Sequence, residues 1–241
     1  MAEGDAPAEP IEVEVKYGVR DPGPIRALID DPDPNLLAEF RPIDAGHVEV
    51  VTDRYVDTDL ATGLLYASGM RARVRESTSG FVLAVKRRGV VSAVGVTSRA
   101  ELEGPASATL DPASWPASAA RSLLLATIGA KPLVEIAALR QTRLVRRFGR
   151  DGAVVEVSLD EIAALDGEDE IDDRVELEAE LKAGPVDALT ELAAALDVVD
   201  GLGFPLGSKL QFALEARGLG AVRPIGGSPN GTIGLLDSRA Q

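Results

Sequence analysis

Residues 11–17 alternate strictly between apolar and charged side chains. Because successive side chains of a β-strand point to opposite faces, one face would carry Glu12, Glu14 and Lys16. Neighbours on that face lie about 6.6–7 Å apart. Two carboxylates this close repel each other unless a cation, such as a divalent metal ion, lies between them. Taken alone, the pattern also fits an ordinary edge strand whose polar face is solvated.

The same alternation returns in later segments, in which almost every polar position is fully charged. These segments are residues 71–75, 81–88, 99–103, 155–160 and 175–182. Their hairpin-like spacing, with only a few helices between them, predicts an α+β fold: an eight-stranded antiparallel β-barrel or tunnel. Such a barrel has either a charged outer surface or a charged lumen with an apolar outer face under flanking helices.

A charged lumen restricts what the barrel can contain. Burying unpaired ions is expensive, so the lumen must be wet or occupied by a ligand. Acidic strands suit hard divalent cations such as Mg²⁺ or Mn²⁺, and strands rich in Arg and Lys suit phosphate oxygens. Enzymes of phosphoryl transfer typically combine a metal ion with several cationic side chains. The sequence therefore favours the barrel with a charged lumen and flanking helices.

Composition excludes several other classes of protein. The 241-residue chain has no cysteine, so it offers no disulfide, thiol catalyst or thiolate metal site. Its single histidine, His47, excludes a multi-histidine metal site and disfavours a Ser-His-Asp triad. A net charge of −14 argues against a nucleic-acid partner. Without a signal-like start or a membrane-length apolar run, we expect a cytoplasmic protein with no membrane partner.

The chain reads as one domain with two irregular ends. We expect a flexible lead at residues 1–9, the tunnel domain at 10–217, and a disordered tail or linker at 218–241, where Gly, Pro, Ser and Asn accumulate. An acidic loop is predicted at 166–173. Helical segments are predicted at residues 25–30, 35–40, 119–128, 186–196 and 208–216.

The ordered series of charged segments resembles the CYTH superfamily, the triphosphate tunnel metalloenzymes that include thiamine-triphosphatase-like proteins. Residues 12–16 match its Glu-x-Glu-x-Lys signature, and residues 69–75 match its Gly-x-x-Leu-Arg-x-Arg strand. Further matching segments follow in order at 55–58, 84–86, 143, 157–160, 175–181 and 208–209. Arg71 departs from the family pattern, which often has an apolar or small residue at that position.

The resemblance implies a barrel whose lumen binds a triphosphate together with Mg²⁺ or Mn²⁺. The residues it assigns to phosphate binding are Lys16, Arg73, Arg75, Lys86, Arg88, Arg143 and Lys209. Those it assigns to the metal are Glu12, Glu14, Asp160, Glu176 and Glu178. Catalysis would fall to Glu12, Lys16 and Glu176. By strand parity, Arg88, Glu101 and Glu103 would also face the lumen.

The expected function is metal-dependent hydrolysis of the terminal phosphate of inorganic triphosphate. The chain has only nine aromatic residues, and no cluster of them suggests a site for a nucleobase. The alternatives are a nucleoside- or thiamine-triphosphate phosphohydrolase, a class IV-type adenylate cyclase, and a module that binds polyphosphate without cleaving it. A homodimer and a partner domain beyond the C-terminal linker remain open.

Overall fold

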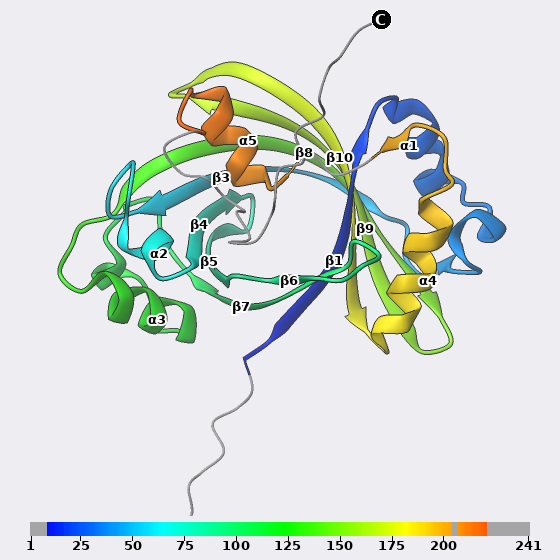
Figure 1. Cartoon of the computed structure of the whole chain (residues 1–241), viewed down its shortest axis with the longest axis horizontal. Helices are drawn as coiled ribbons and strands as arrows, with labels where there is room; N and C mark the ends of the chain where they lie inside the picture. Colours follow the sequence, from blue (N-terminus) through cyan, green and yellow to red (C-terminus); the bar gives the residue numbers. More distant parts are fainter. Residues whose placement is uncertain (1–8, 204–206, 221–241) are drawn as a thin grey trace, which may run out of the picture.

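Eight long strands form a closed antiparallel ring in the computed structural model, which describes residues 9–203 and 207–220. The order around the ring is β1-β10-β9-β8-β3-β4-β5-β7, and pairing of β7 with β1 closes it (Figure 1). The predicted α+β barrel is confirmed. Its strands are β1 (Ile11–Val19), β3 (His47–Asp57), β4 (Met70–Ser77), β5 (Gly80–Arg87), β7 (Thr97–Pro105), β8 (Val134–Arg150), β9 (Ala153–Asp166) and β10 (Asp169–Ala183).

Three two-residue strands lie outside this ring. They are β2 (Arg41–Pro42) beside β8, β6 (Val90–Val91) beside β7, and β11 (Leu202–Gly203) beside β1. Of the expected irregular ends, residues 1–8 and 221–241 lie outside the described part of the chain.

The predicted acidic loop at 166–173 is wrong. Strand β9 continues to Asp166, and β10 begins at Asp169, which pairs with it. Only two residues form the turn between them, and the first, Gly167, has a φ of +65°. A tight hairpin needs such a left-handed residue, and glycine adopts it without steric cost. The acidic residues therefore belong to the ends of two paired strands and not to a loop.

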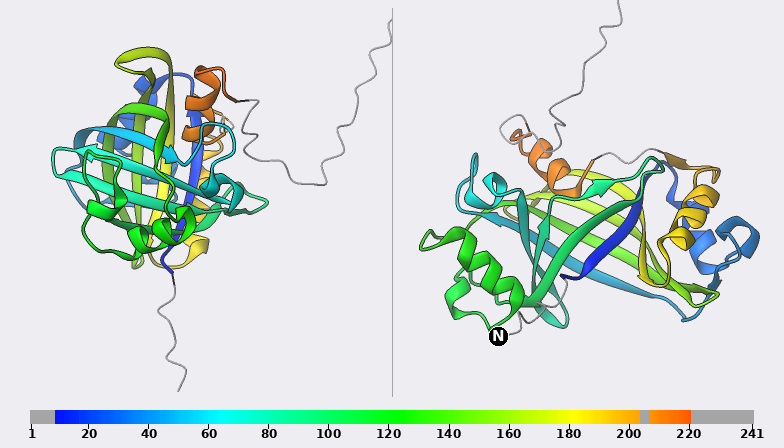
Figure 2. Two further views of the ribbon diagram at one scale, coloured as in Figure 1. Left: turned by 90° about the vertical axis from the view of Figure 1, so that its left-hand side faces the viewer. Right: turned by 60° about the horizontal axis from the view of Figure 1, so that its bottom comes forward.

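Two groups of helices cover the apolar outer face of the barrel. On one side α1 (Pro22–Asp30), the 3₁₀ turn η1 (Pro34–Leu37) and α4 (Val186–Leu196) pack on β1, β8, β9 and β10. On the other side α2 (Leu64–Ala67), the 3₁₀ turn η2 (Pro112–Ser114) and α3 (Ala119–Ile128) flank β3, β4 and β5. Figure 2 shows these two groups on opposite sides of the barrel. The apolar residues of the alternating strands therefore face outward, under helices.

The last helix, α5 (Lys209–Ala216), packs on the inner face instead. Ser208 caps it by accepting a hydrogen bond from the Gln211 backbone N–H. Its Leu210 and Phe212 pack against Tyr55 and other apolar residues of β8 and β9. The inner surface of the barrel is consequently apolar where α5 packs and charged where it does not.

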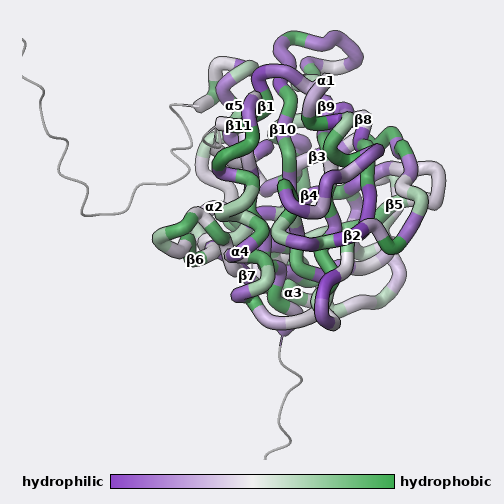
Figure 3. Tube along the Cα trace, turned by 90° about the vertical axis from the view of Figure 1, so that its right-hand side faces the viewer, coloured by the Kyte–Doolittle hydropathy of each residue, from purple (hydrophilic) through white to green (hydrophobic). Residues whose placement is uncertain are grey.

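Hydropathy alternates along the strands, as Figure 3 shows for the tube of the chain. Within the described residues, no helix combines the length and the apolar character that crossing a membrane requires.

Candidate active site in the barrel lumen

The first half of the β1 signature is bonded to cations from β5 and β7. Lys86 Nζ donates to Glu12 Oε1 at 2.8 Å, and Arg99 Nε donates to Glu12 Oε2 at 2.6 Å. Arg99 Nη2 also reaches Glu14 Oε1 at 2.5 Å, while Lys86 lies 3.2 Å from Glu101 Oε2. Burial alone would raise the pKa of Glu12, but the charges of Lys86 and Arg99 lower it to about 2. Glu12 is therefore a firmly ionised carboxylate.

The second half of the signature joins a network on β9, β10 and α5. Lys16 Nζ donates to Glu178 Oε1 at 2.6 Å and lies 3.3 Å from Glu14 Oε2. From the first turn of α5, Lys209 forms ion pairs with Asp160 and, at 3.2 Å, with Glu178. Burial opposes ionisation of Glu178, yet Lys16 and Lys209 hold its pKa well below the ordinary value. Each of these lysines thus bridges two carboxylates.

Arg143 on β8 extends the network toward β3. Its Nε lies 3.0 Å from Asp160 Oδ1, its Nη1 2.9 Å from Glu49 Oε1, and its Nη2 3.0 Å from Ser158 Oγ. Each of the three guanidinium nitrogens therefore donates to a different partner. Glu49 was not among the predicted site residues, although it lies on the face of β3 that points into the lumen.

Arg73 and Arg75 on β4 converge on one carboxylate that the sequence analysis missed. Asp53 is fully buried and accepts from Arg73 Nη1 at 2.9 Å, from Arg75 Nε at 2.7 Å and Nη2 at 2.8 Å, and from Gln141 Nε2 at 2.7 Å. Despite burial, Arg73 and Arg75 lower the pKa of Asp53 below its ordinary value. A carboxylate with this many donors anchors the two arginines. Its only sequence signal is its parity in the strand that contains Tyr55.

Glu176 occupies a different environment from the other carboxylates. Arg174 pairs with its Oε1, and the same guanidinium stacks on the Phe212 ring with 4.5 Å between Arg174 Cζ and the ring centroid. Glu176 Oε2 is buried without a hydrogen-bond partner in the described part of the chain. Burial and the neighbouring Glu178 raise the pKa of Glu176. One of its oxygens is therefore available to a ligand.

Two residues placed in the lumen by parity are not part of this network. Strand β5 ends at Arg87, and Arg88 follows it as an exposed side chain. Glu103 is exposed as well, although Glu101 on the same strand is in the network. Arg88 forms no hydrogen bond or ion pair with the residues that the structure describes, and its lumenal position stays a prediction.

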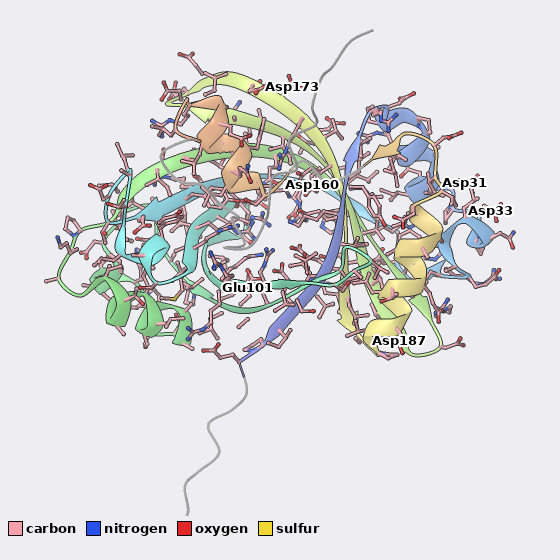
Figure 4. All side chains as sticks on the ribbon, viewed as in Figure 1. Asp31, Asp33, Glu101, Asp160, Asp173 and Asp187 are labelled. Carbon is pink, nitrogen blue, oxygen red and sulfur yellow. The ribbon has the colours of Figure 1, made fainter. Side chains whose placement is uncertain are left out.

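The charges of the lumen are unevenly distributed. We define the cationic wall as Arg71, Arg73, Arg75, Lys86 and Arg99 of β4, β5 and β7, and the acidic wall as Asp160, Glu176, Glu178 and Glu180 of β9 and β10. Figure 4 labels Asp160 and Glu101, both within the ring of strands.

On each wall, at least one group has a pKa shift that disfavours its charged form. On the cationic wall, burial and the charges of Arg73 and Arg99 lower the pKa of Lys86, although Glu12 opposes them. On the acidic wall, burial raises the pKa of Glu180, with further contributions from neighbouring carboxylates. Other groups of the same walls are stabilised in their charged form: despite burial, the pKa of Arg99 is raised by Glu14 and Glu12, and that of Glu178 is lowered by Lys16 and Lys209.

The carboxylates do not surround a common point that is ready for a metal ion. Within residues 9–203 and 207–220, no group of three or more Asp, Glu or His side chains forms such a cluster. The reason is visible in the ion pairs: Lys16 and Lys209 lie between the carboxylates and neutralise them. The donor chemistry still suits Mg²⁺ or Mn²⁺, because Glu176 Oε2 and Glu101 Oε1 are buried oxygens without hydrogen-bond partners among the described residues.

Comparisons with known proteins define the fold. No protein-family model and no curated protein matches the sequence. Among solved structures, a Hippeastrum protein assigned as an adenylyl cyclase, with a dominant triphosphatase activity, matches with a TM-score of 0.58 and 22% identity over 86% of this chain and 96% of that one. A Bacillus halodurans protein assigned as an adenylate cyclase matches with a TM-score of 0.54 and 17% identity over 85% and 97%.

These similarities, at 22% and 17% identity, establish the fold. The chain has the closed antiparallel tunnel fold, and the resemblance seen in the sequence is confirmed at the level of that fold.

Proposed function

We propose that this protein hydrolyses the terminal phosphate of inorganic triphosphate bound in the barrel lumen. The observation that carries the proposal is the presence of two walls of opposite charge within one closed ring of strands. A cationic wall alone would suit any anion. Glu176 and Glu180, whose pKa values are raised, call for a cation that arrives with the anion. The triphosphatase activity described for the Hippeastrum protein supports this choice of reaction.

Binding would exchange the partners of the cationic wall. Lys86 and Arg99 now donate to Glu12 and Glu14. Phosphate oxygens offer both cations equally strong charge-assisted hydrogen bonds, and Arg99 a bidentate one. Arg73 and Arg75 remain held on Asp53, which fixes their guanidinium groups for a ligand. The wall is thus partly preorganised and partly exchangeable.

The metal would be held by the carboxylates of Glu12 and Glu14, which this exchange releases, together with Asp160 and Glu178. Glu176 Oε2, which has no hydrogen-bond partner among the described residues, would stay free for a coordinated water. When bound, Mg²⁺ or Mn²⁺ screens the phosphate charge and lowers the pKa of a coordinated water.

Glu176 is the better candidate for accepting the proton of the attacking water. A general base works best when its pKa approaches the operating pH, and the pKa of Glu176 is raised. Glu12, whose pKa is about 2 and whose two oxygens are bound by Lys86 and Arg99, is a poor base. We therefore assign proton transfer to Glu176 Oε2 and an electrostatic role to Glu12.

Phosphate release from tripolyphosphate, ATP and thiamine triphosphate tests the proposal. Each substrate is assayed with Mg²⁺, with Mn²⁺ and without metal, and the ATP reactions are also examined for cyclic AMP. We expect metal-dependent release that is fastest with tripolyphosphate. Cyclic AMP would identify a cyclase, faster release from ATP or thiamine triphosphate would identify a phosphohydrolase of that ester, and tight binding of polyphosphate without turnover would identify a binding module.

A further inference from the structure

Arg71 belongs to the lumenal face of β4. Its neighbours along the strand, Met70 and Ala72, are buried in the outer core beneath α2 and α3. Side chains alternate along a strand, so Arg71 shares the inner face with Arg73. Across the β4–β5 ladder it is in register with Lys86. The guanidinium of Arg71 therefore extends the cationic wall by one position.

Arg71 differs from the other arginines of this wall in having no counterion. Arg73 and Arg75 both bond to Asp53, whereas Arg71 forms no hydrogen bond or ion pair with any residue that the structure describes. It is half-buried. Burial and the charge of Arg99 lower its pKa. A partly desolvated cation without a partner is unfavourable in the free protein, so an anion is the natural ligand for it.

The space beside Arg71 limits the size of any organic group attached to the bound anion. A cavity beside Arg71, lined also by Asp57, Tyr66 and Leu210, has a volume of about 10 Å³. This is room for roughly one water molecule and none for a nucleoside or a thiazolium group. An organic group attached to the bound anion therefore finds no room in this cavity.

We propose that Arg71 binds the end phosphate opposite the one that is hydrolysed, and thereby selects inorganic triphosphate over its esters. The inference rests on the proposed function and adds a specificity residue to it. An unesterified end phosphate has one more ionisable oxygen than an esterified one. The positive charge of Arg71, which has no ion-pair partner among the described residues, attracts that oxygen. An esterified triphosphate whose terminal phosphate is at the hydrolysis site places its esterified phosphate at Arg71, and that phosphate lacks this oxygen.

Steady-state kinetics of Arg71→Ala, Arg71→Lys and Arg41→Ala, with tripolyphosphate and with ATP in Mg²⁺, test this role. Arg41→Ala removes the same charge from an exposed position outside the ring, where the side chain is 69% exposed. We expect Arg71→Ala to lower kcat/KM for tripolyphosphate about 10- to 100-fold, the range of a hydrogen bond to a charged group, and to change kcat/KM for ATP less than about threefold. Arg71→Lys should fall between, because it keeps the charge and loses the fork.

Thermal unfolding without ligand separates binding from a structural role. Removing a desolvated cation that is repelled by Arg99 should leave the Tm of Arg71→Ala unchanged or higher. Tripolyphosphate should then raise the Tm of Arg71→Ala less than that of the wild type. A lower Tm without ligand, or an equal loss with both substrates, overturns the inference. A wild type that neither binds nor cleaves tripolyphosphate overturns the proposed function, whereas an active wild type matched by Arg71→Ala overturns only the role of Arg71.

Discussion

The cationic and acidic walls of the lumen are built from the same alternating strands but balance their charges differently. On the cationic wall, Arg73 and Arg75 share the single carboxylate of Asp53, which has no other ionic role. On the acidic wall, Lys16 and Lys209 each bridge two carboxylates. The first arrangement is a fixed anchor, and the second is a chain of ion pairs.

The difference separates residues that stabilise the fold from residues whose charges favour the binding of a ligand. Ion pairs around Asp53 fix the side chains of Arg73 and Arg75, and Arg73 Nε stays without a hydrogen-bond partner among the described residues. The crowded groups, Lys86 with a lowered pKa and Glu176 with a raised pKa, are less stable in the free protein than they would be beside an ion of opposite charge. Substitutions at the anchor should therefore affect folding, and substitutions at the crowded positions should affect activity.

The largest expected effect is on stability and follows from Asp53→Asn. This change leaves two buried guanidiniums without a counterion, which destabilises a protein by about 3–5 kcal/mol. Urea unfolding measures the loss. Glu170→Gln is the control, because its ion pair with Arg140 is exposed and contributes at most about 1 kcal/mol. Equal losses in the two variants would show that the anchor has no special role.

Lys86→Ala should chiefly affect activity. We expect turnover of tripolyphosphate to fall about 100- to 1,000-fold, as for loss of one preorganised donor to developing charge. The Tm should change little, because burial and neighbouring cations already disfavour this ammonium. Arg87→Ala provides a neighbouring control on the same strand, since Arg87 pairs with Glu9 at the exposed surface. Full activity in Lys86→Ala would remove it from the site.

Glu176→Gln tests the acidic wall in the same way. The variant keeps the shape of the side chain and loses the proton acceptor, so turnover should fall about 100-fold. Because burial and Glu178 disfavour its charge, the variant should be as stable as the wild type or more stable. Circular dichroism melts beside phosphate release measure both quantities. An active variant, or one with a markedly lower Tm, contradicts the assignment.

The smallest effect is the dependence of stability on pH in the absence of ligand. Glu101, Glu176 and Glu180 have raised pKa values, so the folded state takes up protons before the unfolded state does, and stability should rise as the pH falls from 7 toward the unfolded value of 4.5. Below 4.5 the order reverses for Glu12, whose folded pKa is about 2, and stability should be lost toward that pH. Tm measured from pH 7 to pH 3 should pass through a maximum. A steady decline from pH 7 would show that the acidic wall is not strained.

The sequence predicts the faces of the strands well because alternation has a local cause. Each charged residue of 11–17 lies inside the barrel, and each apolar one lies under the helices or at the end of the strand. Alternation does not show where a strand ends, so it extends the lumenal face to Arg88 although β5 ends at Arg87. A tight turn with a left-handed glycine has the same local composition as a loop, so the sequence predicts a loop where the hairpin turn at Gly167 lies.

The partners of the site residues could not be predicted in the same way. Lys86 meets Glu12 only because β5, β7 and β1 become neighbours when the ring closes. Asp53 was missed because its strand mixes charged and apolar residues on the inner face, as Val51 and Tyr55 show. Such contacts depend on strand order, which a local pattern does not contain.

A crystal structure with tripolyphosphate and Mn²⁺ tests the central claim most directly, because anomalous scattering locates the metal independently of the phosphates. The account predicts phosphates along Arg71, Arg73 and Lys86, with Mn²⁺ among the carboxylates of β1, β9 and β10 beside Glu176 and with Lys86 released from Glu12. Phosphate and metal bound outside the ring of strands, beside an unchanged set of lumenal ion pairs, would contradict it.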